Sequence, residues 1–159
     1  KRGRMNSFVR NYTDSEVKIL DLNNSEHQDA VLSLNNSWVE NKTKSNLHAD
    51  LDKDLIAVER FLNAKFDNVY CVGVYHGDLI GYGVFSFRKP DFVINHFIKA
   101  DISYKGVYEY LMKECAILLC AQKYKFLNYQ EDMGLSGLRQ AKLTYRPISF
   151  LRKYFVNRL

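Results

Sequence analysis

Three basic side chains near the C-terminal end have the spacing of a phosphate-binding site. Arg139, Lys142 and Arg146 are three and four residues apart, which predicts that they share one face of a short helix. Gly134 and Gly137 lie just before them, so backbone N–H groups and the start of the helix could surround the same anion. The pattern therefore predicts a site for a phosphate group, and a solvated basic face is the alternative interpretation.

Two neighbouring carboxylates come directly before this basic stretch. Glu131 and Asp132 follow a predicted strand, where successive side chains point to opposite faces, so we expect one site carboxylate and one structural one. Asp132 is favoured for the site because Gly134 gives the loop beside it conformational freedom. A carboxylate here could position or deprotonate an attacking group, or bind an amino group. Alternatively, Asp132 pairs with Arg139 or caps the following helix. Tyr145 is a candidate proton donor, although such a side chain often serves packing.

A third group of candidates lies on a predicted strand over residues 92–99. His96 alternates there with apolar residues, which favours a buried structural histidine over a general base. Lys99 and Asp101 have the opposite parity to His96 and lie at the end of the strand. We expect these two either to form an ion pair or to contact substrate.

Charge and composition exclude several classes of function. The chain has a net charge of +5, no acid after Asp132, and no acid among its first ten residues. Basic ends of this kind indicate either an anionic partner or plain solubilising charge, and the sequence supports the two interpretations about equally. The four histidines are scattered, the three cysteines form no C-x-x-C pair, and no apolar run approaches the 18 residues of a membrane span. Neither a metal site nor a transmembrane segment is expected.

The periodicity of apolar residues indicates a mixed α/β (α+β) domain. The turn Gly77-Asp78 joins two alternating strands, and a capping box at Ser25 and Gln28 opens a helix. Pro147 must end the last helix by Arg146. The expected elements are a strand 16–22, a helix from 25, a polar loop 40–46, a helix after 50 or 52, strands 69–76, 79–88 and 92–99, a helix to about 122, a strand 126–130, a helix from 136 and a strand 148–156.

The resulting order, β-α-α-β-β-β-α-β-α-β, is the plan of the GNAT acyltransferase fold. In that fold the third and the last of the central strands splay apart, and the acyl donor lies in the gap between them. Fold analogy alone does not establish chemistry.

Three segments of the chain also resemble a known family. They are residues 96–101, residues 127–147 and the opening residues 1–8. They resemble the C-terminal domain of bacterial phosphatidylglycerol lysyltransferases, whose signature is roughly H-F-x-K-A-D followed by N-x-E-x-D-x-G-x-x-G-L-R-x-A-K-x-x-Y-x-P. The run Tyr-Gln-Glu-Asp at 129–132 departs slightly from the family's Asn-Arg-Glu-x-Asp.

The resemblance implies transfer of an aminoacyl group from aminoacyl-tRNA to a lipid or other acceptor, which would attack the ester directly. Arg139 and Lys142 would then bind donor phosphate, Asp132 would position the amino group or acceptor, and Lys99 with Asp101 would lie at the gap. The family has two GNAT-like halves in tandem. Residues 1–159 resemble the second half, so we expect a single domain whose partner is the missing N-terminal half.

No cofactor is expected. CoA-dependent members of the GNAT fold need a phosphate-binding turn of the form Q/R-x-x-G-x-G/A, and this chain has only Ser103-Tyr104-Lys105-Gly106 there. CoA is therefore disfavoured. An acyl-CoA-dependent N-acetyltransferase and a non-catalytic half-domain that binds RNA or its partner half are the rival functions. The expected location is the cytoplasm, extending to the inner membrane surface.

Overall fold

The computed structural model describes residues 1–45, 51–89, 91–152, 154 and 156. They form two structural units, residues 1–128 and the described residues from 129 onward, which are treated separately below. Among the described residues, no helix combines the length and apolar content needed to cross a membrane.

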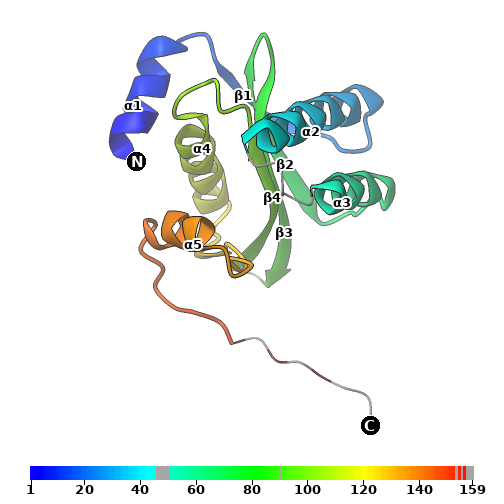
Figure 1. Ribbon diagram of the computed structural model, residues 1–159. Coiled ribbons are helices and arrows are strands. Elements are labelled where there is room, and N and C mark those ends of the chain that lie inside the picture. Colours follow the sequence, from blue (N-terminus) through cyan, green and yellow to red (C-terminus); the bar gives the residue numbers. More distant parts are fainter. Residues whose placement is uncertain (46–50, 90, 153, 155, 157–159) are drawn as a thin grey trace. The chain divides into compact units, whose positions relative to one another are not determined.

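A five-stranded mixed sheet organises the first unit (Figure 1). The strands lie in chain order, antiparallel from the first to the fourth, and the last pair is parallel. They are β1 (Glu16–Leu20), β2 (Val69–His76), β3 (Asp78–Lys89), β4 (Phe92–Ala100) and β5 (Phe126–Asn128). Gly77 adopts a φ of 71° in the β2–β3 hairpin, a conformation that favours glycine.

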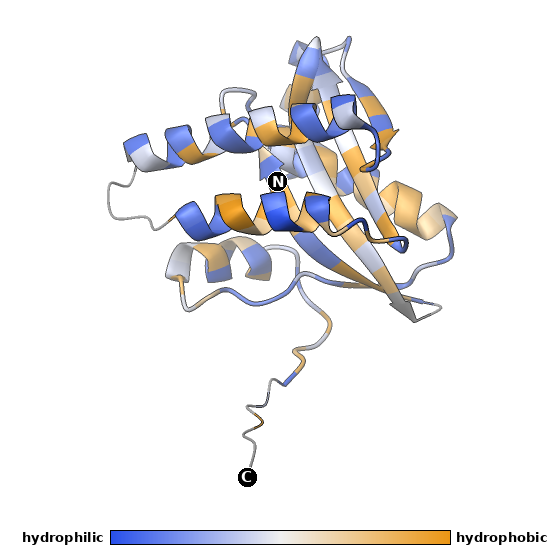
Figure 2. Cartoon of the chain, turned by 90° about the vertical axis from the view of Figure 1, so that its right-hand side faces the viewer, coloured by the Kyte–Doolittle hydropathy of each residue, from blue (hydrophilic) through white to orange (hydrophobic). Residues whose placement is uncertain are grey.

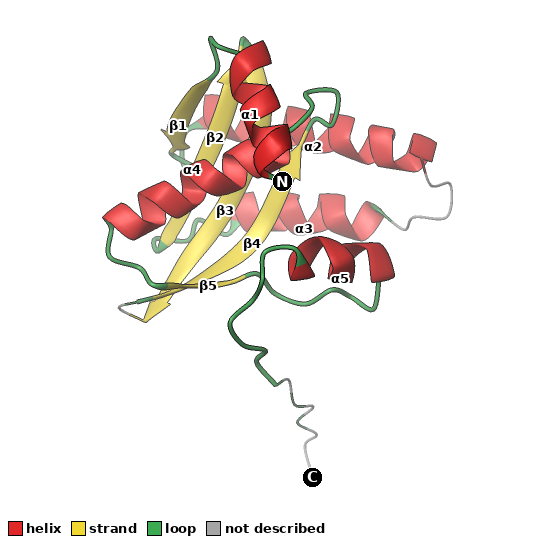
Figure 3. Ribbon diagram, turned by 90° about the vertical axis from the view of Figure 1, so that its left-hand side faces the viewer, coloured by secondary structure: helices red, strands yellow, loops and turns green. Residues whose placement is uncertain are grey.

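Four helices cover the two faces of the sheet. They are α1 (Arg2–Asn11), α2 (Ser25–Ser45), α3 (Asp52–Asn63) and α4 (Val107–Ala121). Helices α1 and α4 pack on one face, as Figure 3 shows, and α2 and α3 on the other. In Figure 2, hydrophilic residues are frequent on the sides of α2 and α3 that face the viewer. The amphipathic pattern of these helices therefore matches their place in the fold.

Each sheet face has its own apolar core. The core under α1 and α4 consists of Phe8, Val72, Val74, Ile80, Phe85, Val93, Ala100, Val107, Leu111, Cys115 and Leu119. The core under α2 and α3 consists of Leu20, Val31, Leu34, Val58, Leu62, Cys71, Leu79, Tyr82 and Val84. Side chains alternate between faces along a strand, so one sheet supplies both cores.

Strand β4 is irregular in two ways that matter for function. Val84 pairs with Phe97 while Phe85 pairs with Asn95, so His96 is an extra residue in a β-bulge. Only the first three residues of β4 pair with β5, ending at Ile94. Among the described residues, the rest of that β4 edge has no strand partner. The pairing of β4 with β5 therefore stops well short of the end of β4, where the predicted fold has its gap.

Three sequence expectations need correction. Helix α1 was not expected at all, because its apolar positions are few. Helix α2 is capped by Asn24, whose Oδ1 accepts the N–H groups of Glu26 (2.8 Å) and His27 (3.3 Å), instead of by a box at Ser25. The helix also continues through the predicted loop at 40–45, since polar residues with good helix propensity extend a helix in solvent as well as they form a loop.

The second unit contains α5 (Ser136–Leu143) and irregular chain on either side of it. The predicted strand 148–156 is wrong for residues 148–152, 154 and 156, none of which lies in a strand. In strand geometry Arg152 would share a face with the apolar residue Phe150, which opposes burial of that face. The observed order therefore begins and ends with a helix.

Candidate functional site

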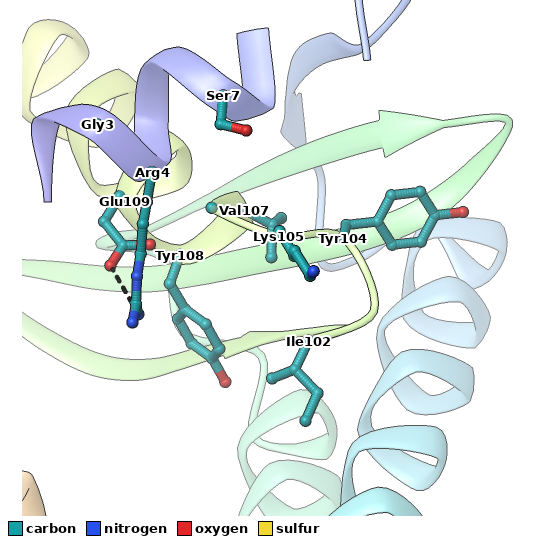
Figure 4. Close-up of a pocket in the computed structure, with 10 residues that line it drawn as sticks. Gly3, Arg4, Ser7, Ile102, Tyr104, Lys105, Val107, Tyr108 and Glu109 are labelled. Carbon is teal, nitrogen blue, oxygen red and sulfur yellow. Dashed lines mark ion pairs between the residues drawn. The ribbon is translucent and has the colours of Figure 1, made fainter. Parts of the chain in front are cut away.

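A cavity of about 440 Å³ opens where β4 passes into α4 (Figure 4). Its walls come from α1, the turn after β4 and the first turn of α4. The lining residues are Gly3, Arg4, Ser7, Ile102, Tyr104, Lys105, Gly106, Val107, Tyr108 and Glu109. The end of β4, where the fold places its acyl donor, therefore carries a hollow large enough for part of a donor molecule.

The polar groups of the cavity favour an anionic ligand. The start of α4 contributes the positive end of the helix dipole, and the N–H of its first residue, Val107, already donates to the backbone oxygen of Tyr104 at 3.1 Å. Lys105 and Arg4 add two cations, and Arg4 makes a long ion pair of 3.8 Å with Glu109. The Arg4 side chain is 78% exposed, so an incoming anion can compete with Glu109 for it.

Helix α1 covers part of the turn 103–106, which stands where CoA-dependent members of the fold have their phosphate-binding turn. Gly106 caps α4 with a φ of 94°, and a Cβ on it would lie 2.2 Å from the backbone oxygen of Arg4. The side of the glycine next to α1 is therefore covered by backbone. The turn itself is shaped by Asp101, whose Oδ1 accepts the N–H of Ser103 at 2.9 Å.

Lys99 lies on the other face of the sheet. Its Nζ is 2.8 Å from Oδ1 of Asp54 and 3.3 Å from the ring centroid of Trp38, and its side chain is 7% exposed. Burial lowers the pKa of Lys99, and the hydrogen bond and charge of Asp54 partly oppose that shift. The partner of Lys99 is therefore Asp54 on α3, 45 residues away, and the ion pair predicted with Asp101 is wrong.

Trp38 connects this buried ion pair to the cavity. Its Nε1 donates to the hydroxyl of Tyr108 at 2.9 Å, and Tyr108 also lines the cavity. Burial raises the pKa of the Tyr108 hydroxyl, so it stays protonated. Helices α2 and α4 are thus linked around the end of β4. No spacing in the sequence could predict this link, because its members lie 70 residues apart.

The bulge in β4 also corrects the predicted parity of His96. Its Nε2 lies 2.7 Å from Oγ of Ser86, and its ring is 5.9 Å from that of Phe61 on α3. Lys99 contacts α3 as well, so the two side chains share a face of the sheet. The extra residue of the bulge reverses the alternation between them. His96 therefore matches the structural interpretation.

The carboxylates of the second unit lie in a loop, because β5 ends at Asn128. Asp132 Oδ2 lies 2.5 Å from Nε of Arg139, and its Oδ1 accepts the N–H of Gly134 at 2.9 Å. The Arg139 guanidinium holds the pKa of Asp132 below its ordinary value. Asp132 therefore pairs with Arg139, which is one of the alternatives that the sequence left open. Glu131 is exposed, and the strand argument for opposite faces does not apply to either carboxylate.

Lys142 and Arg146 in this unit have different surroundings and do not form one basic face. Lys142 Nζ donates to the backbone oxygens of Tyr129 (2.5 Å) and Glu131 (2.6 Å), which fixes the loop, and burial lowers its pKa. Arg146 lies beyond the end of α5 with a φ of 54°, so the predicted helix face shared by all three cations is wrong. Tyr145 packs edge-on against Tyr129, with ring centroids 5.7 Å apart.

Comparison with known proteins identifies the family. The family model described as phosphatidylglycerol lysyltransferase, C-terminal, matches residues 1–157. No curated protein matches the chain. A solved structure of a conserved protein of unknown function from Bacteroides thetaiotaomicron VPI-5482 is 23% identical with a TM-score of 0.80, and the match covers 93% of this chain and 49% of that one. The chain thus spans about half the length of that relative.

Two acetyltransferase structures show the same fold at lower identity. A ribosomal-protein-alanine N-acetyltransferase from Brucella melitensis biovar Abortus 2308 is 14% identical with a TM-score of 0.60, covering 91% of this chain and 99% of that one. An aminoglycoside acetyltransferase from an uncultured soil metagenomic sample is 11% identical with a TM-score of 0.61, covering 95% and 99%. The chain therefore belongs to the phosphatidylglycerol lysyltransferase C-terminal family and has the GNAT-like acyltransferase fold.

Proposed function

We propose that this chain transfers an aminoacyl group from aminoacyl-tRNA to a lipid acceptor of the phosphatidylglycerol type. The cavity at the start of α4 carries the proposal. It combines a helix N-terminus with the cations Arg4 and Lys105, which suits the phosphates at the acceptor end of a tRNA. The missing glycine-rich turn supports a donor other than CoA.

The proposed reaction is a direct transesterification. A hydroxyl oxygen of the acceptor attacks the aminoacyl ester carbon, the bond from that carbon to the ribose oxygen breaks, and the ribose oxygen gains the proton that the attacking hydroxyl loses. The exchange needs no metal or redox partner. The protein therefore contributes by holding the acceptor hydroxyl and the aminoacyl ester in the right position and orientation. We propose that Lys99 acts in this positioning indirectly, through Trp38 and Tyr108, and that Asp101 acts through the turn that it shapes at the end of β4.

Residues of the second unit are proposed contacts for the reactants. Arg139 has a side chain that is 59% exposed, so it can reach a donor phosphate while paired with Asp132. We assign Lys142 and Arg146 to the same donor contact, and Asp132, Glu131 and Tyr145 to the amino group or the acceptor. The N-terminal GNAT-like half that accompanies this domain in the family is the proposed partner that completes the site.

The test is a titration of the chain with lysyl-tRNA and with acetyl-CoA at the same salt concentration. We expect saturable binding of the tRNA, with a negative slope of log affinity against log salt. Lys105→Gln should weaken tRNA binding several-fold and reduce that slope by about 0.7, the value for one phosphate contact on a single strand. Lys18→Gln is the charge-matched control, because Lys18 is an exposed lysine on β1, at the opposite edge of the sheet from β5.

Two outcomes would count against the proposal. Binding of acetyl-CoA with no binding of the tRNA would identify a CoA-dependent acetyltransferase, the rival that the fold alone supports. Equal tRNA affinities for Lys105→Gln and Lys18→Gln would exclude the cavity as the donor site. Transfer of labelled lysine into phosphatidylglycerol vesicles, measured with the N-terminal half of a tandem relative present, then tests the acceptor.

A further inference from the structure

The C-terminal segment of the second unit (residues 146–156) exposes many apolar side chains. Its described apolar residues are between 66% and 92% exposed: Ile148, Phe150, Leu151, Tyr154 and Val156. None of the described residues of the segment lies in a helix or strand. Single apolar residues are common on protein surfaces, but five within nine positions are not. The segment therefore has the composition of a surface that binds something.

The charge around the segment limits what that partner can be. After Asp132 the sequence has six cations and no acid: Arg139, Lys142, Arg146, Arg152, Lys153 and Arg158. Two of them, Arg146 and Arg152, are described residues within the segment and are exposed. A partner surface for it must accept both apolar side chains and positive charge, and must supply the negative charge itself.

The order of residues in the segment disfavours a protein partner. If the segment added a strand to a sheet, Arg152 would share a face with Phe150 and Tyr154, and Lys153 would share the other face with Leu151. Either face would then bury a cation among apolar residues, and charged residues are depleted from the centres of protein interfaces. A membrane surface has no such conflict, since long basic side chains reach the head groups while neighbouring apolar groups insert.

We propose that residues 146–156 bind the surface of an anionic lipid membrane. Ile148, Phe150 and Leu151 enter the boundary between head groups and acyl chains, and Arg146 and Arg152 contact lipid phosphates. The inference rests on the proposed lipid acceptor, because the contact would bring the domain to the membrane that contains its substrate. A single segment combining apolar insertion with clustered positive charge supplies the two signals that stable peripheral binding needs.

The test is sedimentation of the 159-residue chain with vesicles, with no donor present. One set of vesicles mixes phosphatidylglycerol with phosphatidylcholine, and the other contains phosphatidylcholine alone. We expect binding to the anionic set, weakened by 0.5 M salt. Phe150→Ser with Leu151→Ser should reduce the partition coefficient about tenfold or more, and Arg146→Gln with Arg152→Gln about tenfold. A circular dichroism melt of each variant checks that the first unit stays folded.

Matched controls alter the same chemistry elsewhere. Ile117→Ser removes a half-exposed apolar side chain from α4, and Lys18→Gln with Lys113→Gln removes two exposed positive charges from the first unit. Both controls should bind as the original chain does. Failure of the original chain to bind anionic vesicles, or equal binding by the tail variants, would overturn the inference. The inference would also be overturned if the original chain self-associates, and if the tail variants lose this self-association but still bind vesicles. None of these results affects the tRNA titration, so the two proposals fail separately.

Discussion

Replacing Asp54 with Asn should expose the energetic cost of burying Lys99. Asn keeps the size of the side chain but removes the negative charge 2.8 Å from Nζ of Lys99. The lysine side chain is 7% exposed, so little water can replace the lost partner. The ring of Trp38 beneath it can offset only part of the loss, because a cation–π contact is weaker than a charge-assisted hydrogen bond.

The size of the effect follows from how far each partner is buried. Removing one partner of a fully buried ion pair costs about 3–5 kcal/mol. Asp54 has a side chain that is 41% exposed, so the pair is partly screened and we expect a loss of about 2 kcal/mol at neutral pH. In a domain of this size that loss lowers the melting temperature by about 4–8 °C.

The loss should shrink as the pH rises. The pKa of Lys99 in the folded chain lies below its ordinary value of 10.5, mainly through burial, so between the two values the unfolded chain binds more protons. Stability therefore increases with pH across that window, and the burial penalty is complete below it. Asp54→Asn removes the two effects that raise this pKa and so widens the window toward neutral pH. The slope is at most about 1.4 kcal/mol per pH unit for one proton.

Urea unfolding of a double-mutant cycle measures the interaction directly. Lys99→Met keeps the chain length and removes the buried charge, so it should change stability by less than about 1 kcal/mol. Asp54→Asn should then cost almost nothing in the Lys99→Met background. The reasoning fails if Asp54→Asn is as stable as the original chain, or if it costs the same in both backgrounds.

Three further predictions concern α1, α2 and the second unit. Trp38→Phe removes the donor to Tyr108 and should lower the free energy of unfolding by about 1–2 kcal/mol, measured by urea unfolding. Gly106→Ala places a Cβ 2.2 Å from a backbone oxygen of α1 at a φ of 94°, so it should cost about 2 kcal/mol or more and increase hydrogen exchange in α1. Arg139→Gln should raise the pKa of Asp132 toward its ordinary value, since that guanidinium is the main cause of its lowering, as an NMR titration would show.

The predictions for Gly106 and Arg139 each have a control and a result that would contradict them. Gly137→Ala adds a Cβ in open space on α5 and should not destabilise the chain. Unchanged exchange in α1 after Gly106→Ala would show that the helix does not depend on this contact. Arg152→Gln should leave the titration of Asp132 unchanged, and a shift equal to that of Arg139→Gln would point to general charge instead of the observed pair.

The sequence alone predicted most of the fold because the apolar pattern is local. The alternation in residues 69–88 around Gly77 and the helical stripe after Val107 each need only neighbouring residues to be recognised, and both are confirmed. The long motif from 127 to 147 identified the family in the same way, since a run of fixed residue types needs no knowledge of the fold. Short or polar elements, such as α1 and the end of α2, were missed because their pattern is weak.

What only the tertiary structure decided is which side chains meet. The partner of Lys99, the link from Trp38 to Tyr108 and the cover that α1 places on Gly106 all join segments at least 45 residues apart. One bulged residue in β4 was enough to put His96 and Lys99 on the same face of the sheet, where simple alternation predicts opposite faces. Local periodicity records whether a residue is buried, whereas the identity of its neighbour depends on how whole elements pack, and that is settled by the sum of many long-range contacts.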